Sequence, residues 1–334
     1  MKVALCGLGE IGQIHLKAIR ESGARLVAVC ELDRDLAAAS VGDEVPVFSD
    51  IEEMIEQSRP DVVDVCLPHH LHVPVAVTAL RSGCDVLLEK PMAADLAGCD
   101  EILAVAKETG QRVGVSHNQV HFDPHRRLRH LIDSGDIGEI RSIYERLWMG
   151  GKYGGWREDA AQVGGGLLMD AGVHRIYMAE YLGGPVRSVT AVMDSPRSED
   201  AFVLTLDFES GALGVIQGGY HGPDGVFDDR IEIQASEGMV EVLGCEAFFE
   251  GDLEGDLRLR ARINGVWAED PVVGHWDQSV MASVKAVLDD FEAGRDPEVG
   301  LAEGRAAVAV VEAAYRSAET GRTIPMSELD ERKA

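Results

Sequence analysis

The sequence predicts an α/β fold in two parts: a doubly wound parallel sheet covered by helices, then an α+β domain with an open, mostly antiparallel sheet. From residue 2 to about residue 117, short runs rich in β-branched residues alternate with helix-length amphipathic stretches, a pattern typical of parallel sheets. After Pro124, consecutive strand-like runs are separated by short turns. We therefore predict two domains, residues 1–122 and 123–334.

Helix-start signals and apolar runs place the elements of the first domain. Asp50 precedes a helix predicted over Ile51–Gln57, because an aspartate there accepts hydrogen bonds from the first N–H groups of a helix. Asp95 likewise precedes a helix over Leu96–Thr109, which Gly110 ends. The predicted strands are Lys2–Cys6, Arg25–Cys30, Pro46–Phe48, Val62–Leu67, Asp85–Leu88 and Arg112–Ser116.

The second domain is expected to open with a helix that ends near Ser134. A glycine-rich loop, Met149–Gly155, leads to a second helix near Gly166–Leu182. Turns such as Glu209-Ser210-Gly211 then join neighbouring strands, which predicts antiparallel pairing. The predicted strands are Ile140–Trp148, Val186–Met193, Ala201–Phe208, Ala212–Gly219, Arg230–Ala235 and Gly238–Leu243, and the closing helices lie near Gln278–Ala293 and Leu301–Thr320.

Composition excludes several classes of partner. The formal net charge of −27 repels phosphate backbones and anionic lipid surfaces, so neither nucleic acid nor a membrane is expected. The sequence has no apolar run of membrane-spanning length and no signal-peptide pattern, and we expect a cytoplasmic protein. The six cysteines form no C-x-x-C pair, which argues against disulfides and a zinc site.

Three glycines, Gly7, Gly9 and Gly12, follow the first predicted strand and open a helix, with Glu10 and Ile11 between them. A G-x-G-x-x-G run alone is a weak signal, since a glycine-rich turn is often only a turn. Between a strand and a helix, such glycines let the backbone approach a pyrophosphate, and the helix N-terminus offers oriented N–H groups. We interpret this segment as a dinucleotide-binding site.

Glu31 ends the second predicted strand, roughly twenty residues beyond the glycines. An acidic side chain there accepts hydrogen bonds from both ribose hydroxyls of the adenosine half, and it repels a 2′-phosphate. Glu31 therefore favours NAD. Arg34 keeps NADP as the less favoured cofactor, and an exposed glutamate at a strand end is also ordinary.

Lys90 follows the apolar strand Asp85–Leu88 and Glu89. This is the carboxyl end of a parallel strand, the edge at which open α/β sheets bind ligands. Pro91 biases Lys90 away from the helical region and restricts the direction of its side chain. The alternative is a surface lysine paired with Glu89. A lysine that is only exposed to solvent, however, rarely follows an apolar strand and precedes a proline. We interpret Lys90 as a functional residue.

Asp170 and His174 stand four residues apart after the glycine run Gly164–Gly166. On a helix they share one face, as the members of a catalytic dyad, a metal pair or a surface ion pair would. Apolar neighbours and the preceding glycines argue against a solvated surface. A metal site needs a third ligand.

A histidine cluster after Pro68, comprising His69, His70 and His72, is the tempting source of that ligand. It follows the predicted strand Val62–Leu67, however, where it can equally start a helix and line a cofactor cleft. We therefore expect no bound metal.

In their order and spacing, these motifs resemble the Gfo/Idh/MocA oxidoreductases, which include glucose–fructose oxidoreductase, inositol dehydrogenases and many sugar dehydrogenases. The resemblance covers nearly the whole chain: Ile132–Ile140 resembles the segment that opens the second domain of the family, and Ser317–Arg322 resembles its closing helix. Its motifs are G-x-G-x-x-G at Gly7–Gly12, His72 in P-x-x-x-H, Lys90 in E-K-P, and the G-G-x-x-x-D-x-G-x-H run that ends at His174.

The resemblance implies a Rossmann domain followed by a domain whose open sheet often mediates oligomers, so we expect a homodimer or homotetramer formed through the C-terminal sheet. It also implies that Lys90, Asp170 and His174 are catalytic. His174 would take the hydroxyl proton, and Lys90 would stabilise the alkoxide-like oxygen and share the proton relay. Asp170 would orient His174 or hold a substrate hydroxyl.

Further positions match the motifs of the family. Pro68, His69, His72 and Glu89, together with Lys90, are expected to contact the cofactor, although relatives often carry asparagine in place of His69.

Asn118 and His121 are expected near the nicotinamide or the substrate. Trp156 and Arg157 resemble a W-R pair that lines a polyol site in relatives; hinge packing is the alternative for Trp156.

The predicted function is an NAD-dependent dehydrogenase that transfers hydride between nicotinamide and a secondary alcohol or ketone of a sugar, cyclitol or sugar derivative. One alternative keeps NAD bound and cleaves or epimerises a glycosidic substrate by transient oxidation. Another is a non-catalytic dinucleotide-binding sensor, against which the presence of Lys90, Asp170 and His174 argues.

Overall fold

The computed structural model of the chain describes residues 1–152, 154–222, 227–243, 259–270, 272 and 274–330. The chain forms two compact units. The first consists of Met1–Asn118 and Val280–Arg305, and the second of Gln119–Ser279 and the residues from Ala306 onward. The domain boundary that the sequence predicts between residues 122 and 123 stays a prediction.

The first unit contains a six-stranded sheet in the order β3-β2-β1-β4-β5-β6, with every neighbouring pair parallel. The strand order reverses beside β1, which is where doubly wound sheets bind dinucleotides. The doubly wound prediction is therefore confirmed. The strands are β1 (Lys2–Cys6), β2 (Arg25–Cys30), β3 (Val47–Phe48), β4 (Val62–Val65), β5 (Asp85–Glu89) and β6 (Val113–Ser116).

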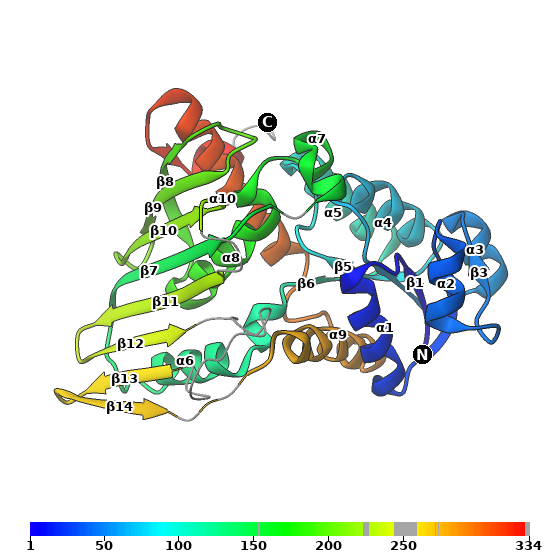
Figure 1. Cartoon of the computed structure of the whole chain (residues 1–334), viewed down its shortest axis with the longest axis horizontal. Helices are drawn as coiled ribbons and strands as arrows, with labels where there is room; N and C mark the ends of the chain where they lie inside the picture. Colours follow the sequence, from blue (N-terminus) through cyan, green and yellow to red (C-terminus); the bar gives the residue numbers. More distant parts are fainter. Residues whose placement is uncertain (153, 223–226, 244–258, 271, 273, 331–334) are drawn as a thin grey trace. The chain divides into compact units, whose positions relative to one another are not determined.

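Helices cover this sheet, and one of them comes from the far end of the sequence. In Figure 1, α9 runs beside α1, and Val284, Val287 and Phe291 of α9 share a buried core with Leu16 and Ile19 of α1. The sequence predicted both helices, but not that α9 would join the first unit. The helices are α1 (Glu10–Ser22), α2 (Arg34–Val41), α3 (Ile51–Ser58), α4 (His72–Arg81), α5 (Leu96–Thr109) and α9 (Trp276–Glu292).

The second unit contains a nine-stranded sheet in the order β14-β13-β12-β11-β7-β10-β9-β8-β15. The prediction of a mostly antiparallel sheet is confirmed, and the one parallel pair among the described strands of this sheet is β7 with β10. The sequence reading missed β13, β14 and β15. The strands are β7 (Ile140–Met149), β8 (Val186–Met193), β9 (Ala201–Phe208), β10 (Leu213–Gly219), β11 (Phe227–Ala235), β12 (Gly238–Leu243), β13 (Leu259–Ile263), β14 (Val266–Asp270) and β15 (Ile324–Pro325).

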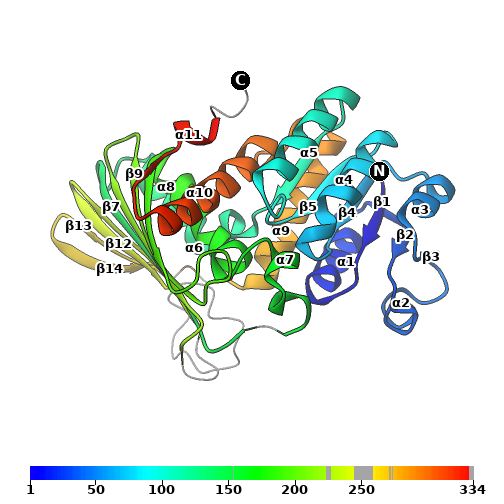
Figure 2. The ribbon, with the colours of Figure 1, turned by 90° about the horizontal axis from the view of Figure 1, so that it is seen from above.

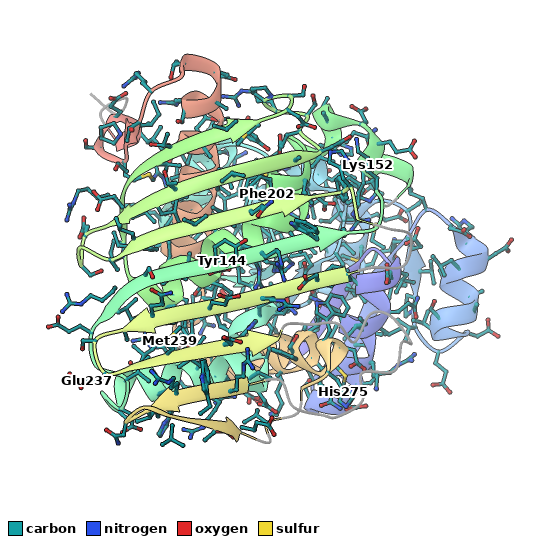
Figure 3. All side chains as sticks on the ribbon, turned by 60° about the vertical axis from the view of Figure 1, so that its left-hand side comes forward. Tyr144, Lys152, Phe202, Glu237, Met239 and His275 are labelled. Carbon is teal, nitrogen blue, oxygen red and sulfur yellow. The ribbon has the colours of Figure 1, made fainter. Side chains whose placement is uncertain are left out.

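The side chains of β7 alternate between the two faces of this sheet. Ile143 and Glu145 are buried on the face that the helices cover, which Figure 2 shows nearly edge-on. Tyr144 points to the other face, seen in Figure 3, and donates a hydrogen bond to Gln217. The helices of this unit are α6 (Asp123–Asp133), α7 (Ala160–Val163), α8 (Val173–Gly183), α10 (Leu301–Thr320) and α11 (Ser327–Asp330).

The helix predicted near Gly166–Leu182 is present, but its first part is not a regular α-helix. The segment forms a π-helical turn, η4 (Leu168–Gly172), and then α8. Gly172 allows this close packing, because a Cβ there would lie 3.0 Å from both Leu168 and Phe202. The argument that residues four apart share a face assumed 3.6 residues per turn throughout, whereas the i→i+5 hydrogen bonds of the π turn change the angle between Asp170 and His174.

Three short 3₁₀ segments complete the elements near the predicted site: η1 (His69–Leu71), η2 (Asn118–His121) and η3 (Gly155–Glu158). Within the described residues, no helix has both the length and the apolar character needed to span a bilayer.

Candidate active site

The glycine turn between β1 and α1 has the shape that a pyrophosphate needs. Gly7 has a φ of +90°, and a Cβ there would lie 2.2 Å from the carbonyl oxygen of Cys66. A Cβ on Gly12 would lie 2.2 Å from the carbonyl oxygen of Gly7, so α1 packs on the turn too closely for a side chain. Gly9, in contrast, has open space at its Cβ position. The three glycines thus divide the roles found in dinucleotide-binding turns: tight turn, open approach and close packing.

The first turn of α1 contains Glu10 and Ile11. Gly9 is the N-cap, and among the described residues no side chain caps it. The N–H groups at the start of a helix have no partner within the helix, and such a terminus binds phosphate. Glu10 is exposed and Ile11 is half-buried, so both border the open side of the turn.

The carboxylate of Glu31 is fixed beside this turn. Its Oε2 accepts a hydrogen bond from the N–H of Leu8 at 2.8 Å, and its Oε1 accepts one from the N–H of Asp33 at 2.9 Å. The carboxylate therefore lies where the sequence analysis expected a group for the ribose of a bound nucleotide. Arg34, at the start of α2, is exposed.

Pro68, His69 and His72 lie together after the end of β4. Pro68 is the N-cap of η1, and His69 is buried with its ring centroid 5.6 Å from that of His72. Both histidines are thus part of the packed carboxyl edge of the first sheet.

Both ring nitrogens of His72 face backbone carbonyl groups. Nδ1 lies 2.8 Å from the carbonyl oxygen of Pro91, and Nε2 lies 2.8 Å from that of Leu67. Burial, and to a smaller extent the charge of Lys90, lowers the pKa of His72, although the two carbonyls oppose the change. A neutral ring has one N–H, so His72 donates to one of these carbonyls at a time, either at the end of β4 or in the segment that carries Lys90.

Glu89 ends β5 in a buried position, and the half-buried Lys90 follows with a cis peptide bond to Pro91. The backbone N–H of Lys90 donates to Glu89 Oε2 at 3.2 Å, and Nε2 of His15 lies 3.2 Å from Glu89 Oε1. Burial would raise the pKa of Glu89. The hydrogen bond and charge of His15 and the charge of Lys90 outweigh burial and hold that pKa below its usual value, so an ionised carboxylate accompanies Lys90.

Asn118 and His121 lie in η2, directly after β6. Asn118 is buried and His121 is half-buried. Burial, with the charge of Arg126, lowers the pKa of His121 to about 4. Burial and the charge of Lys90 lower the pKa of His117, one residue before η2, to about 3. Both imidazoles are therefore neutral near pH 7.

The glycine run before η4 is needed for close packing in the second unit. A Cβ on Gly165 would lie 2.0 Å from the hydroxyl oxygen of Tyr315, and one on Gly166 would lie 2.3 Å from backbone atoms of Glu199. The Glu199 carboxylate accepts hydrogen bonds from the N–H of Leu168 at 2.7 Å and the hydroxyl of Tyr315 at 3.2 Å. Burial raises the pKa of Glu199 to about 7. These contacts fix the start of η4.

The structure brings Asp170, Arg157 and Trp156 together. The buried Asp170 carboxylate accepts a hydrogen bond from Nε of Arg157 at 3.3 Å, and the Arg157 guanidinium lies 4.6 Å from the centroid of the Trp156 ring. His174, in the first turn of α8, is half-buried. A π-helical turn is uncommon and is found often at functional sites.

Arg175, the chain neighbour of His174, lies in a buried ion cluster. Its Nη1 is 2.6 Å from Oδ1 of Asp229, its Nε is 3.7 Å from Oε2 of Glu145, and all three side chains are fully buried. Burial raises the pKa of Glu145 to about 8, with Asp229 adding to the rise and Arg175 opposing it. This cluster anchors α8 to β7 and β11.

Two family descriptions match the chain. "Oxidoreductase family, NAD-binding Rossmann fold" matches residues 1–117, and "GFO/IDH/MocA C-terminal domain" matches residues 125–241. The chain belongs to the Gfo/Idh/MocA oxidoreductases.

Several individual proteins are similar to this chain over part or most of their length. Myo-inositol 2-dehydrogenase of Thermotoga maritima is 25% identical over 98% of this chain and 99% of its own. D-Glucoside 3-dehydrogenase of Escherichia coli is 32% identical over 57% of either chain. The crystal structure of aldose-aldose oxidoreductase from Caulobacter crescentus, complexed with glycerol, is 26% identical with a TM-score of 0.85 and covers 97% of this chain and 99% of that one.

The predicted site residues of this Gfo/Idh/MocA oxidoreductase fall into two groups, one on each compact unit. Within these groups, the structure joins Glu31 to the glycine turn, His69 to His72, Lys90 to Glu89, and Arg157 to both Asp170 and Trp156. The first unit carries Gly7, Gly9, Glu10, Ile11, Gly12, Glu31, Pro68, His69, His72, Glu89, Lys90 and Asn118, and the second carries His121, Trp156, Arg157, Asp170 and His174.

The sequence analysis missed several side chains that hold these groups in place, notably His15, Asp64, Glu199 and Tyr315. Asp64 gave a signal that was available: it interrupts the valine-rich β4 and is fully buried. A single acid within an apolar central strand indicates a buried cationic partner.

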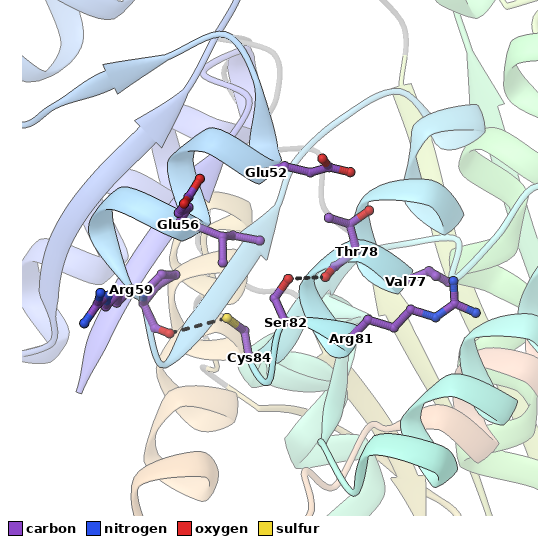
Figure 4. A pocket seen from close by; sticks show the side chains of 10 residues that line it. Glu52, Glu56, Arg59, Val77, Thr78, Arg81, Ser82 and Cys84 are labelled. Atoms are coloured by element: carbon purple, nitrogen blue, oxygen red, sulfur yellow. Dashed lines mark hydrogen bonds between the residues drawn. The ribbon is translucent and has the colours of Figure 1, made fainter.

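A hollow of about 760 Å³ opens on the first unit of this oxidoreductase, between α3 and α4 (Figure 4). Two residues in its wall mark the amino ends of two strands: Pro60 lies just before β4, and Cys84 lies just before β5. Cys84 Sγ donates a hydrogen bond to the carbonyl oxygen of Pro60. The hollow is therefore at the amino ends of these strands, whereas the glycine turn and Lys90 are at the carboxyl ends. It is not part of the candidate cofactor site.

Proposed function

We propose that this oxidoreductase is an NAD-dependent dehydrogenase that transfers a hydride between nicotinamide and a secondary alcohol or ketone of a sugar, cyclitol or sugar derivative. The observation that carries the proposal is Lys90 at the carboxyl end of β5, beside the ionised Glu89, in a domain with an NAD-binding fold. A cation at this edge is suited to an oxygen on which negative charge develops.

The residues of the first unit fit NAD. The open backbone at Gly9 and the first turn of α1 would bind the pyrophosphate, and the Glu31 carboxylate would accept hydrogen bonds from the adenosine ribose. NAD, when bound, supplies the hydride acceptor. Pro68, His69 and Asn118 are proposed to border the nicotinamide half.

The residues of this chain would handle the proton and the charge on the substrate oxygen. His174 is the proposed base for the hydroxyl proton, since imidazole exchanges protons near neutral pH. Lys90 would stabilise the alkoxide-like oxygen and share the proton relay. Asp170, held by Arg157, would orient His174 or bind a substrate hydroxyl, with Trp156 and His121 bordering the polyol.

The test of the reaction is NADH absorbance after the purified protein is mixed with NAD and a panel of cyclitols, aldoses, amino sugars and glycosides, and again with NADP. We expect a rise with NAD and one substrate group. No rise across the panel, with nucleotide retained through purification, would contradict net dehydrogenation and favour the retained-NAD alternative.

Cofactor choice is tested separately through Glu31. Glu31→Gln removes the charge that repels a 2′-phosphate, so the preference for NAD over NADP, measured as the ratio of kcat/KM values, is expected to fall by roughly 10-fold or more. An unchanged ratio would remove Glu31 from cofactor selection. Asp35→Asn, an exposed acid in the first turn of α2, is the control.

We further propose a homodimer or homotetramer formed through the uncovered face of the nine-stranded sheet. Val192 and Val203 pair across β8 and β9 and are 72% and 42% exposed, and Trp148 of β7 is 39% exposed. Exposed apolar side chains grouped on one sheet face are typical of protein–protein interfaces. Light scattering of the wild type and of the two single variants Val192→Lys and Val203→Glu tests this arrangement, and each variant is expected to have a lower mass than the wild-type oligomer. A monomeric wild type would contradict the arrangement.

A further inference from the structure

A buried polar cluster lies on the side of the first sheet that faces α1, and one of its members, Glu89, directly precedes Lys90. His15 comes from α1, Asp64 from β4 and Glu89 from the end of β5. His15 and Asp64 are fully buried and Glu89 is 8% exposed. Polar groups are costly in such a position unless they are paired, so the contacts between them decide what the cluster can do.

Both ring nitrogens of His15 face carboxylates. Nδ1 lies 2.9 Å from Asp64 Oδ2, and Nε2 lies 3.2 Å from Glu89 Oε1. An ionised carboxylate only accepts hydrogen bonds, so both contacts are satisfied together only when the ring carries two protons. Burial would lower the pKa of His15, but the charge of Asp64, the neighbouring Cys66 and the hydrogen bonds to both together outweigh burial and raise that pKa well above its usual value. Geometry and electrostatics agree on an imidazolium.

The charges of the cluster and of Lys90 balance. Two carboxylates, one imidazolium and the Lys90 ammonium sum to zero, whereas without the imidazolium one negative charge would remain in the buried site. Among the described residues, four further polar groups near the cluster are uncharged near pH 7. Ser116 hydrogen-bonds Glu89, burial lowers the pKa values of His117 and His72, and burial raises the pKa of the Cys66 thiol.

We propose that His15 is a positioning residue for the dehydrogenase reaction: clamped between Asp64 and Glu89, it fixes the Glu89 carboxylate and thereby holds Lys90 in the orientation and charge state that the reaction uses. This inference rests on the proposed function. The link from His15 to Lys90 is short, because Glu89 contacts the His15 ring through Oε1 and the Lys90 N–H through Oε2.

A metal ion is the competing explanation for such a cluster. Donor atoms of His15, Asp64 and Cys66 lie within 4.8 Å of one another. The hydrogen bonds already described account for both nitrogens of His15, however, and the third member, Cys66, donates its own hydrogen bond to Asp64 at 3.7 Å. The geometry is that of an ion pair shared by three side chains.

The first experiment reads the charge of His15 directly. Nitrogen-15 NMR of histidine-labelled protein, with the His15 signal assigned by His15→Gln, is expected to show both ring nitrogens protonated at pH 7. A neutral tautomer at pH 7 would overturn the proposal. A His15 signal that changes when EDTA is added would also overturn it, since the cluster would then hold a metal.

The second experiment follows Lys90 without relying on turnover. The lysines are methylated with carbon-13, and the Lys90 signal, assigned by Lys90→Arg, is titrated in the wild type and in His15→Gln. The midpoint is expected to move to higher pH in the variant, because a nearby positive charge has been removed. His125→Gln is the control: His125 is also fully buried, but its Nδ1 faces the carbonyl oxygen of Gln119 and not an acid. An unchanged midpoint in His15→Gln would overturn the proposal.

Kinetics then separate this inference from the proposed function. In His15→Gln, kcat is expected to fall by roughly 10- to 100-fold while KM changes by less than about 3-fold, with the pH midpoint of kcat moved in the direction of the Lys90 signal. Full activity in His15→Gln would contradict the positioning role of His15 and leave the proposed function unaffected. Absence of dehydrogenase activity in the wild type would sink the proposed function, while the Lys90 titration would still report whether His15 controls Lys90.

Discussion

Two buried ion clusters in this chain each contain one cation, one aspartate and one glutamate, yet the pKa values of the two glutamates shift in opposite directions. In the first unit, His15 lies 2.9 Å from Asp64 and 3.2 Å from Glu89, and the pKa of Glu89 is lowered. In the second unit, Arg175 lies 2.6 Å from Asp229 but 3.7 Å from Glu145, and the pKa of Glu145 is raised to about 8.

Burial opposes ionisation of both glutamates, so burial cannot explain the difference. The position of the cation can. His15 is shared by two acids through its two opposed ring nitrogens, whereas Arg175 pairs closely with one acid and leaves the other beyond hydrogen-bond distance. Each cluster includes the chain neighbour of a proposed catalytic residue: Glu89 precedes Lys90, and Arg175 follows His174. We infer that the first cluster sets charge near the site and that the second mainly anchors a helix.

The role given to the His15 cluster depends on Lys90 being catalytic, so the variant with the largest expected effect removes Lys90. Lys90→Ala is expected to lower kcat by about 10³-fold or more, because the group aimed at the developing charge is gone, while the Kd for NADH changes by less than about 3-fold. Lys107→Ala, at an exposed position in the last turn of α5, is the control. Unchanged turnover in Lys90→Ala would show that Lys90 is not catalytic, and the His15 cluster would then have no catalytic residue to position.

Removal of the permanent cation tests the anchoring role of the second cluster. Arg175→Met leaves the Asp229 carboxylate and the protonated Glu145 in a fully buried position without a cation, so the free energy of unfolding is expected to fall by about 3–5 kcal/mol. Arg187→Met, which breaks an exposed pair with Asp207, should cost at most about 1 kcal/mol. Urea denaturation of both variants gives the measurement, and equal losses would show that the buried cluster contributes no more than a surface pair.

The raised pKa of Glu145 predicts a pH dependence with a definite sign. Between about pH 4.5 and about pH 8 the unfolded chain ionises this carboxyl while the folded chain keeps its proton, so the wild type should lose stability as the pH rises through that window. Glu145→Gln lacks this slope and is expected to be the more stable protein near pH 8, by on the order of a few kcal/mol. Parallel stability curves for the two proteins would place an ionised Glu145 in the folded state.

The smallest expected effect contrasts two fully buried histidines. The folded-state pKa of His15 is raised, so its stabilisation is complete below about pH 6.5 and is lost as the pH rises through the folded value. The pKa of His125 is lowered to about 3, mainly by burial, so the wild type loses stability as the pH falls from about 6.5 towards 3.

Melting temperatures of His15→Gln and His125→Gln against pH test this contrast. The deficit of His15→Gln should be larger at pH 6 than at pH 9, and that of His125→Gln should shrink as the medium becomes more acidic. Deficits that follow the same trend in both variants would contradict the assignment of opposite charge states to the two rings.

Local sequence determined the order and kind of most elements. Runs such as Lys2–Cys6 and Leu96–Thr109 were predicted with the bounds that the structure has, because alternation, capping and glycine stops act within a few residues. The glycine turn and the place of Lys90 at a strand end follow from the same local rules. What each candidate residue does chemically is still a prediction that rests on the proposed function.

Tertiary structure decided what local rules could not reach. The sequence did not show that α9 would complete the core of the first unit, that β10 would pair in parallel with β7, or that η4 would interrupt a helix. The His15 clamp joins residues 49 and 74 positions apart. Such contacts have no signature in spacing, because the charge state of a buried side chain depends on which distant groups the folded chain brings within hydrogen-bond distance of it.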